Sequence, residues 1–149
     1  MNIRKLTVND LSRIAEIFIF NNRINYFPIF KDEHYSFGEL QVVSFVDYWK
    51  QNKEIMDNVY VYDDGIVKGF IEIHDTEIYK LYVDPFFQNN LIGKALITFA
   101  IENYKVNYLW ALEKNTKAIS FYQKYGFHIT KYRSSIYSYE CGCDELKKL

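Results

Sequence analysis

The chain has 149 residues, a length that suits one compact domain, and we expect residues 1–149 to form a single domain. Hydrophobic residues make up 49% and charged residues 25%, close to globular averages, which excludes a disordered or collagen-like chain. The net charge of −1 gives no excess of basic residues for binding nucleic acid. Aromatic residues make up 19%, an excess that must lie in a core, a pocket or both.

No segment has the pattern of a membrane span or an export signal. The most apolar stretch, residues 95–101, is far shorter than the roughly 20 residues that cross a bilayer. Polar residues near the N-terminus interrupt any signal-peptide pattern. The cysteines, Cys141 and Cys143, cannot complete a four-ligand zinc site, so we expect reduced thiols, no metal and a cytoplasmic location.

Apolar spacing in the first third of the chain predicts one strand and two helices. Residues 3–6 indicate a strand, and Thr7 with Asp10 has the spacing of a capping box before a helix. A second helix is expected from residue 37 or 38 to about residue 51. The aromatic stretch between them, residues 26–35, contains a proline that disfavours helix at the preceding residue, so we expect a loop or a broken helix.

The rest of the chain predicts a β-meander followed by alternating helices and strands. Asp64-Gly65 is a strong hairpin-turn signal between two β-rich runs, and Pro85 ends a third run. We expect strands at 58–62, 66–74 and 77–83, a helix at 92–104, a strand at 108–112, a helix at 116–125, and strands near 128–131 and 135–139. The order βααβββαβαββ is that of an α/β domain with a mixed sheet.

The segment from Leu81 to Leu96 has the pattern of a strand, a polar loop and the start of a helix. The first backbone N–H groups of a helix have no partner within it, and with the helix dipole they form a site suited to phosphate. Gly93 would let the chain approach such a group closely. The alternative is an ordinary loop with a glycine packed against the sheet.

The segment 109–127 places aromatic residues on one face of a predicted helix. Asn115 stands where a helix N-cap belongs. The residues that recur at helical spacing after it are Ala118, Phe121, Tyr122 and Tyr125. By itself, this pattern is typical of a helix N-cap followed by a row of side chains that pack in the core.

Together the two segments resemble the GNAT-type N-acetyltransferase family. Its acyl-CoA loop has a Gln or Arg, two residues, a Gly, one residue, and then Gly or Ala, which residues 88–93 match except that Leu91 replaces the first Gly. Its block Asn-x-x-Ala-x-x-Phe-Tyr-x-x-x-Gly-Phe is matched by residues 115–127. The resemblance spans nearly the whole chain and implies an α/β (α+β), GNAT-like acyl-CoA N-acyltransferase fold, with a mixed central sheet of about seven strands flanked by about four helices.

The resemblance implies acetyl-CoA as the co-substrate. In the family it lies in a V between two splayed strands, here the strand ending at Val83 and the strand at 108–112. The pantetheine arm pairs with the backbone of one strand and is held by Asn115; the strand residues are Leu81, Tyr82 and Val83. The pyrophosphate rests on loop amides, here those of Gln88, Asn89, Asn90, Leu91, Ile92, Gly93 and Lys94.

Leu91 is the one departure from the family pattern. Leucine at positive φ costs about 1 kcal/mol, so we expect ordinary negative φ there, with the side chain turned away from the phosphates. On that expectation, the substitution Leu91→Gly slightly destabilises the protein through added entropy of the unfolded chain.

The resemblance also assigns the chemistry, in which the acceptor amine attacks the thioester directly. Glu77, at the start of its strand, matches the general base of several members, with Glu72, Glu113 or a water relay as alternatives. Tyr122 matches the tyrosine that protonates the departing thiolate; its alternative is core packing. A backbone N–H near Tyr82, where the family usually has a β-bulge, would stabilise the oxyanion.

In this fold, the connection between the first two helices shapes the acceptor pocket. Its aromatic residues favour an amine with an apolar or aromatic body; they are Tyr26, Phe27, Phe30 and Tyr35. Acidic residues there are few, Asp32 and Glu33, which argues weakly against polycationic acceptors. The alternative is that these aromatics belong to the core.

Three functions remain open from the sequence. The first is an acetyl-CoA-dependent N-acetyltransferase for a small-molecule or peptide amine, as a monomer or homodimer that binds neither nucleic acid nor membrane. The second is a catalytically weak or inactive CoA-binding module with a GNAT-like fold, which Leu91 alone favours. The third is a protein that binds a small aromatic ligand without CoA.

Overall fold

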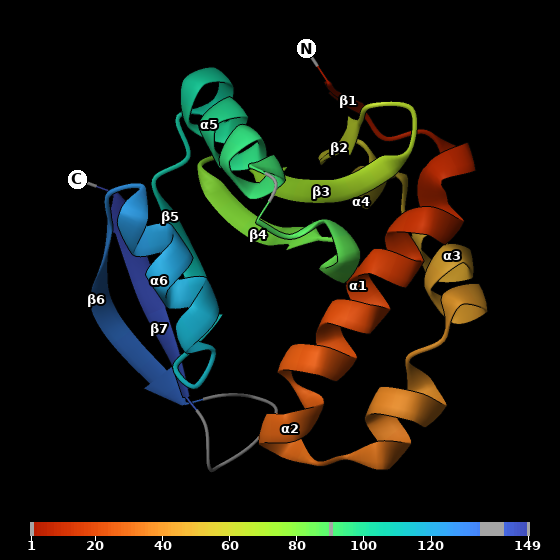
Figure 1. The fold of residues 1–149 in the computed structure, drawn as a ribbon, viewed down its shortest axis with the longest axis horizontal. Helices are drawn as coiled ribbons and strands as arrows, with labels where there is room; N and C mark the ends of the chain where they lie inside the picture. Colours follow the sequence, from red (N-terminus) through yellow and green to blue (C-terminus); the bar gives the residue numbers. More distant parts are fainter. Residues whose placement is uncertain (1, 90, 135–141, 149) are drawn as a thin grey trace.

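The computed structural model describes residues 2–89, 91–134 and 142–148, and these form one mixed sheet with helices packed on it (Figure 1). The strands are β1 (Ile3–Lys5), β2 (Val59–Asp63), β3 (Val67–His74), β4 (Glu77–Val83), β5 (Tyr108–Leu112), β6 (Phe127–Ser134) and β7 (Gly142–Lys148). Their order across the 7-stranded sheet is β1-β2-β3-β4-β5-β7-β6. Neighbouring strands are antiparallel except β4 and β5, which run parallel. The mixed sheet and the predicted order of elements are therefore confirmed.

The helical segments follow the predicted order and add several short turns. The α-helices are α1 (Leu11–Asn25), α2 (Phe27–Phe30), α3 (Val42–Lys50), α4 (Lys53–Met56), α5 (Ile92–Tyr104) and α6 (Thr116–Lys124). Two 3₁₀ turns, η1 (Val8–Asp10) and η3 (Pro85–Phe87), and one π-helical segment, η2 (His34–Glu39), complete them. The sequence analysis did not predict α4 or the three η segments.

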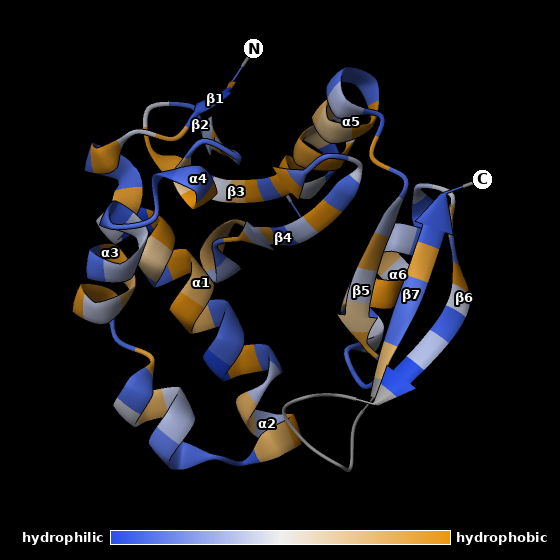
Figure 2. Ribbon diagram, turned by 180° about the vertical axis from the view of Figure 1, so that it is seen from behind, coloured by the Kyte–Doolittle hydropathy of each residue, from blue (hydrophilic) through white to orange (hydrophobic). Residues whose placement is uncertain are grey.

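Each face of the sheet carries its own hydrophobic core, because side chains alternate along the strands. Val59, Val61 and Phe70 point to the face that α1 and α3 cover. Ile71 and Ile73 point to the opposite face, where they meet apolar residues of α5 and α6. Helices α1 and α3 lie side by side (Figures 1 and 2). The sheet is thus the middle layer between two pairs of helices.

The start of the first helix follows the prediction, whereas the second predicted helix is wrong in part. The Thr7 N–H donates to the Asp10 carboxylate over 2.8 Å, as a capping box requires, although the first turn is 3₁₀. The predicted second helix is interrupted by extended backbone at Leu40 and Gln41. The part before this break is the π-helical η2, and the part after it is α3, so the apolar spacing had joined two separate segments.

The aromatic stretch forms a broken helix, one of the two alternatives predicted for it. Pro28 lies in the first turn of α2, where the missing N–H of a proline costs nothing. Lys31 then adopts left-handed backbone with φ of 54°, which ends the helix. The chain therefore turns from α1 towards η2 within a few residues.

The C-terminal end of the sheet holds a strand that the sequence analysis missed. Strand β7 lies between β5 and β6, and Glu145 and Leu146 on it are buried. Its charged residues hide the apolar alternation that identifies a strand. The strand predicted at 135–139 lies outside the described residues. Strand β6 is longer than predicted and forms the mainly hydrophilic edge of the sheet (Figure 2).

Strands β4 and β5 separate along their length. The pairing joins Glu77 to Tyr108 and Ile78 to Leu109, and no further pair is formed between the described residues of the two strands. Figure 2 shows the strands diverging beyond this point. The backbone edge of β4 that follows Ile78 therefore has no strand partner on the β5 side in the described part of the chain.

Candidate active site

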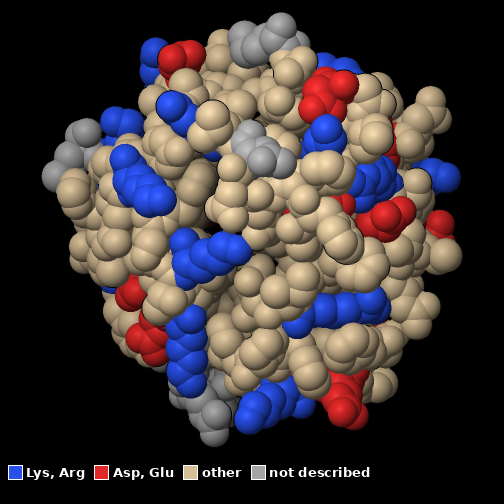
Figure 3. Space-filling view, viewed as in Figure 1, with Lys and Arg blue, Asp and Glu red and all other residues tan. Residues whose placement is uncertain are grey.

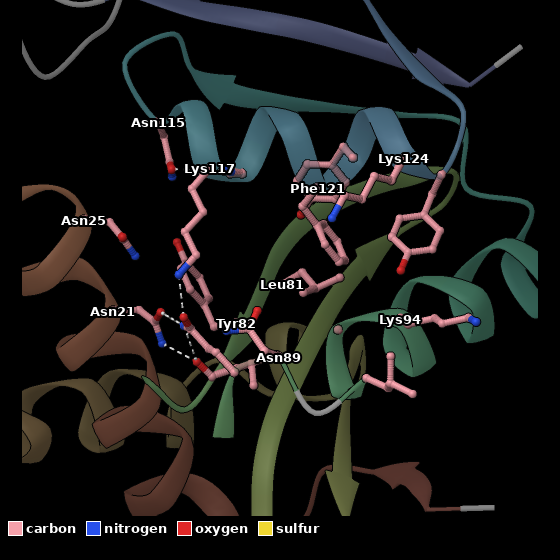
Figure 4. Close-up of a pocket in the computed structure, with 17 residues that line it drawn as sticks. Asn21, Asn25, Leu81, Tyr82, Asn89, Lys94, Asn115, Lys117, Phe121 and Lys124 are labelled. Atoms are coloured by element: carbon pink, nitrogen blue, oxygen red, sulfur yellow. Dashed lines mark hydrogen bonds between the residues drawn. The ribbon is translucent and has the colours of Figure 1, made fainter. Parts of the chain in front are cut away.

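A cavity of about 360 Å³ lies between α6, the end of β4 and the loop that leads into α5 (Figure 4). Most of the residues expected to bind acetyl-CoA line it: Leu81, Tyr82, Val83, Gln88, Asn89, Leu91, Gly93, Lys94, Asn115 and Tyr122. Ile92 does not line it, because its side chain is buried in the core. Asn90 lies outside the described residues. We call this space the first cavity.

Asn115 and Asp84 hold two segments that border the first cavity, the start of α6 and the turn after β4. The Asn115 side chain accepts a hydrogen bond from the Ala118 N–H over 3.2 Å, which confirms the predicted N-cap of α6. The buried Asp84 carboxylate accepts from the Phe86 N–H over 2.8 Å and from the Arg13 guanidinium over 2.7 Å. The turn after β4 is therefore tied to α1.

A chain of amide groups crosses the first cavity from α1 to α6. Gln88 Nε2 donates to Asn21 Oδ1 and to the Val83 carbonyl, each over 3.2 Å. Asn21 also donates to the Val83 carbonyl over 2.9 Å. From α6, Lys117 Nζ donates a hydrogen bond to Gln88 Oε1 over 2.6 Å (Figure 4). The sequence analysis missed Asn21 and Lys117, because no local pattern links them to the loop.

The loop before α5 contradicts the expected backbone at Leu91. Leu91 has φ of 64° and ψ of 11°, the left-handed conformation, whereas negative φ was expected. Leu91 is 71% exposed and is also one of the residues that line the first cavity, so the expectation that its side chain turns away from the phosphates stays a prediction. Asn89 also has positive φ, 70°. The loop keeps the backbone that a glycine would adopt, and the leucine carries the conformational cost of about 1 kcal/mol.

The close packing of α5 against α6 requires a residue without a side chain at Gly93. A Cβ atom at Gly93 would lie 3.1 Å from Cε2 of Phe121, closer than side chains normally pack. Helix α5 therefore passes close to the Phe121 ring of α6. The closest contact of Gly93 is thus with a helix, whereas the alternative had placed it against the sheet, and both helices border the first cavity.

Tyr122 packs in the core and also borders the first cavity. Its ring packs edge-on against Phe121 and Phe127, with centroids 5.2 and 5.8 Å away, and it is 7% exposed. It also lines the first cavity. Burial, with a smaller effect of Tyr26, raises the pKa of the Tyr122 phenol well above its usual value. The hydroxyl therefore keeps its proton at neutral pH.

A second cavity, of about 740 Å³, is bordered by α1, η2, β4 and β5. Three of the residues expected to line an acceptor pocket do so, namely Tyr26, Phe30 and Tyr35, and Glu77 lines it as well. Phe27 is not among the lining residues; its ring packs edge-on against Phe37 at 5.1 Å. In the aromatic stretch, Tyr26, Phe30 and Tyr35 therefore line the second cavity, whereas Phe27 packs against another side chain.

The acidic side chains considered as the general base have different surroundings. Glu77 lines the second cavity, and its hydrogen bond raises the pKa of the Tyr108 phenol. Glu72 is 2% exposed, and its two oxygens contact His74 Nε2 at 2.6 Å and Lys80 Nζ at 3.1 Å. Glu113 lines neither of the two cavities. Glu77 alone of the three faces a space that an amine can enter.

Tyr82 is the residue that lines both cavities. Its ring packs edge-on against Phe18 at 5.3 Å, and its hydroxyl lies 3.4 Å from that of Tyr26. Burial raises the pKa of the Tyr82 phenol well above its usual value. The first and second cavities therefore meet at Tyr82, near the end of β4.

The β-bulge of β4 is displaced from the position expected for it. Glu72 pairs with Lys80 and Ile73 pairs with Ile78, so Tyr79 is the extra residue. Pairing is regular from Lys80 to Val83, and the expectation of a bulge near Tyr82 is wrong by three residues. The Tyr79 ring stacks on His74 at 3.9 Å and lines the second cavity.

The described residues contain neither a metal-binding cluster nor a membrane-spanning helix. Within 2–89, 91–134 and 142–148, no group of His, Cys, Asp and Glu side chains is placed to hold a metal ion. None of the helices described is long and apolar enough to cross a membrane. Cys143 lines the second cavity, and Cys141 lies outside the described residues.

Sequence comparisons match the central part of the chain to one family. Residues 56–129 match the family model of the acetyltransferase (GNAT) domain. Peptidyl-lysine N-acetyltransferase YiaC of Escherichia coli is 35% identical over 68 residues, which are 45% of this chain and 47% of that protein. The chain thus spans about half the length of this relative. Spermidine N(1)-acetyltransferase of Thermoplasma acidophilum is 24% identical over 144 residues, with 87% of this chain and 89% of the relative covered.

Solved structures share the fold over almost the whole chain. The apo form of YjaB from Escherichia coli has a TM-score of 0.77 at 16% identity, covering 99% of this chain and 96% of that one. PaiA N-acetyltransferase from Thermoplasma acidophilum, solved with coenzyme A, has a TM-score of 0.71 at 23% identity, covering 99% and 98%. At these identities the likeness shows the fold.

Proposed function

We propose that the chain is an acetyltransferase of the GNAT family, whose domain model matches residues 56–129, and that it transfers an acetyl group from acetyl-CoA to a primary amine. The observation that carries the proposal is the junction at Tyr82, where the first cavity meets the cavity that Glu77 lines. Direct transfer needs both substrates bound at once with the amine within reach of the thioester. Two cavities that share a wall residue suit that need.

The first cavity fits the chemistry of coenzyme A. Lys94, Lys117 and Lys124 line it, and phosphate groups need such cations. Basic side chains lie beside the hollow on this face (Figure 3). The edge of β4 that faces away from β3 offers backbone groups for an extended arm, because β5 has diverged from it. We infer that Leu81, Tyr82 and Val83 with Asn115 hold the pantetheine.

The phosphates would lie at the loop that leads into α5. In this proposal the backbone amides of Gln88, Asn89, Asn90, Ile92, Gly93 and Lys94 hold the pyrophosphate, together with that of Leu91. Helix α5 has 13 residues, and Gly93 and Lys94 of its first turn line the first cavity. The positive end of this helix adds to the attraction for anions.

The residues proposed for proton transfer line the two cavities, Tyr122 the first and Glu77 the second. Glu77 accepts a proton from the acceptor amine as its nitrogen bonds to the acetyl carbon. As the carbon–sulfur bond breaks, the Tyr122 hydroxyl donates a proton to the leaving sulfur. The proton that Glu77 has gained returns to solvent, and Tyr122 is reprotonated from solvent, so each turnover leaves both residues as they began.

The two other functions considered receive less support. Leu91 was the reason to consider an inactive CoA-binding module, but the loop keeps the left-handed backbone that a glycine would adopt. A protein that binds an aromatic ligand without CoA does not explain why lysines line the first cavity. Relatives named for peptidyl-lysine and spermidine both acetylate amines, which supports an amine acceptor.

A panel of amines tests the proposed function. Free thiol is measured after acetyl-CoA is mixed with aromatic amines, amino acids, lysine peptides or polyamines, and the acetylated product is identified by mass. We expect at least one amine to release thiol and form acetylated product in equal amounts. If acetyl-CoA binds but no amine raises thiol release above the amine-free rate, the chain is a CoA-binding module and the proposed activity is wrong.

A further inference from the structure

The charged side chains that border the second cavity differ in their partners. Lys80 contacts the Glu72 carboxylate at 3.1 Å, and His34 lies 3.6 Å from Glu39. Arg133 has no acidic partner in the part of the chain that the structure describes. It is thus a cation of this cavity whose charge the described residues leave available.

Arg133 is held in place by an aromatic ring. Its guanidinium carbon lies 3.9 Å from the centroid of the Trp110 indole, although the two residues come from β6 and β5, with β7 between them. A guanidinium stacked on a ring uses its face for that contact. Its N–H groups lie in its plane, so they remain free to donate two parallel hydrogen bonds. A planar carboxylate is the group that matches such a donor pair.

The rest of the second cavity defines what is attached to that carboxylate. Glu77 on β4 lines the same cavity and is the group proposed to deprotonate the amine. Tyr26, Phe30 and Tyr35 supply aromatic wall. A polyamine would bring only cations to Arg133 and Lys80. The other carboxylates that line the cavity already have partners within the chain: Asp32 accepts from the Tyr35 N–H, and Glu39 lies beside His34. An amine with an aromatic body and an acidic group gives Glu77, the aromatic wall and Arg133 each a partner.

We propose that the acceptor is an amine that carries a free carboxylate, of the aromatic amino-acid class, and that Arg133 stacked on Trp110 binds the carboxylate. The inference rests on the proposed function, because it names the substrate class of that acceptor cavity. Arg133 is here a residue that determines substrate specificity, because it binds the carboxylate of the acceptor and not the amine that is acetylated.

Matched pairs of amines test the inference. Tyrosine and tyramine, phenylalanine and phenethylamine, and tryptophan and tryptamine differ by the carboxylate alone. Calorimetric titration into the protein saturated with CoA measures their affinities without turnover. We expect the carboxylated member of at least one pair to bind about tenfold tighter or more, which is 1.4 kcal/mol.

Variants of β6 assign the preference to Arg133. R133Q should bind both members of a pair equally, and R133K should keep part of the preference, since lysine retains the charge and loses the planar pair of donors. K131Q is the matched control: Lys131 is an exposed cation on the same strand that does not line the cavity, and it should keep the wild-type preference.

The outcomes separate this inference from the proposed function. Equal affinities within each pair in the wild type, an undiminished preference in R133Q, or no binding of any carboxylated amine at millimolar concentration would each overturn the carboxylate site. Thiol release with amines that lack a carboxylate would still uphold acetyl transfer in those cases. Failure of all amines to release thiol, with the carboxylate preference intact, would reject the activity and keep the site.

Discussion

Lys117 on α6 donates a 2.6 Å hydrogen bond to Gln88, a residue 29 positions away in the loop after β4. Gln88 in turn donates to Asn21 on α1, so the contact ties three separate parts of the chain around the first cavity. The proposed phosphate-binding loop is therefore braced on both sides. Lys117 also brings a positive charge to the place where the polyanionic ligand is proposed to bind.

Replacement of Lys117 by glutamine should weaken acetyl-CoA binding by about fivefold to tenfold, because a cation near the phosphates is lost. Titration calorimetry measures the affinity. Lys114→Gln is the matched control, since Lys114 is exposed on the turn before α6 and does not line the first cavity. Equal effects of the two substitutions would show that Lys117 contributes only to the general charge of the surface.

Replacement of Leu91 by glycine should stabilise the protein by up to about 1.6 kcal/mol, the reverse of the expectation from sequence. Relief of the left-handed leucine gains about 1–2 kcal/mol, and the greater entropy of the unfolded glycine takes back about 0.4–1 kcal/mol. Urea unfolding measures the change. Leu91→Ala retains the strained backbone and should leave stability near the wild-type value, because the side chain is largely exposed. A less stable Leu91→Gly would show that the leucine carries no strain.

Replacement of Glu77 by glutamine should lower turnover by ~10²-fold or more, with little change in acetyl-CoA affinity, because the amide cannot accept the amine proton. Steady-state kinetics with the best amine of the panel measures it. Glu72→Gln is the comparison: Glu72 is buried between His74 and Lys80, so its loss should reduce stability more than chemistry. Wild-type turnover in the Glu77→Gln variant would show that water, and not Glu77, accepts the proton of the amine.

Replacement of Tyr122 by phenylalanine should lower kcat and leave acetyl-CoA affinity nearly unchanged, because only the hydroxyl is lost. The same variant tests the burial of that hydroxyl. The pKa of Tyr122 is raised from 10.0, so the folded state holds the proton more tightly than the unfolded chain, and the folded protein loses stability as pH rises above 10. Tyr122→Phe should lose less stability between pH 8 and pH 10.5 in urea unfolding. If Tyr122→Phe turns over at the wild-type rate, Tyr122 contributes to packing only and does not donate the proton to the leaving sulfur.

Local signals in the sequence predicted the elements that border the site. The N-cap at Asn115 and the capping box at Thr7 depend on residues three positions apart, and both are present in the structure. The parallel pairing of β4 with β5 confirms the arrangement implied by the family resemblance. The two caps can be predicted because neighbouring residues determine them, whereas the strand arrangement was implied by the family resemblance alone.

The features that the sequence analysis missed depend on distant residues. Gln88 meets Asn21 across 67 positions, and no pattern in the sequence links them. Strand β7 is identified by its place between β5 and β6, since its charges mask the apolar alternation. Leu91 was given the locally favourable backbone, but the loop between β4 and α5 requires the left-handed one. In each case, the tertiary structure overrides the local preference.

Titration of acetyl-CoA into the protein tests the central claim most directly, because the proposed chemistry depends on the first cavity binding it. We predict one molecule bound per chain and a melting temperature that rises with ligand concentration, since a ligand bound by the native state alone stabilises that state. A folded protein that shows neither heat of binding nor a shift in melting temperature at millimolar acetyl-CoA would contradict the account.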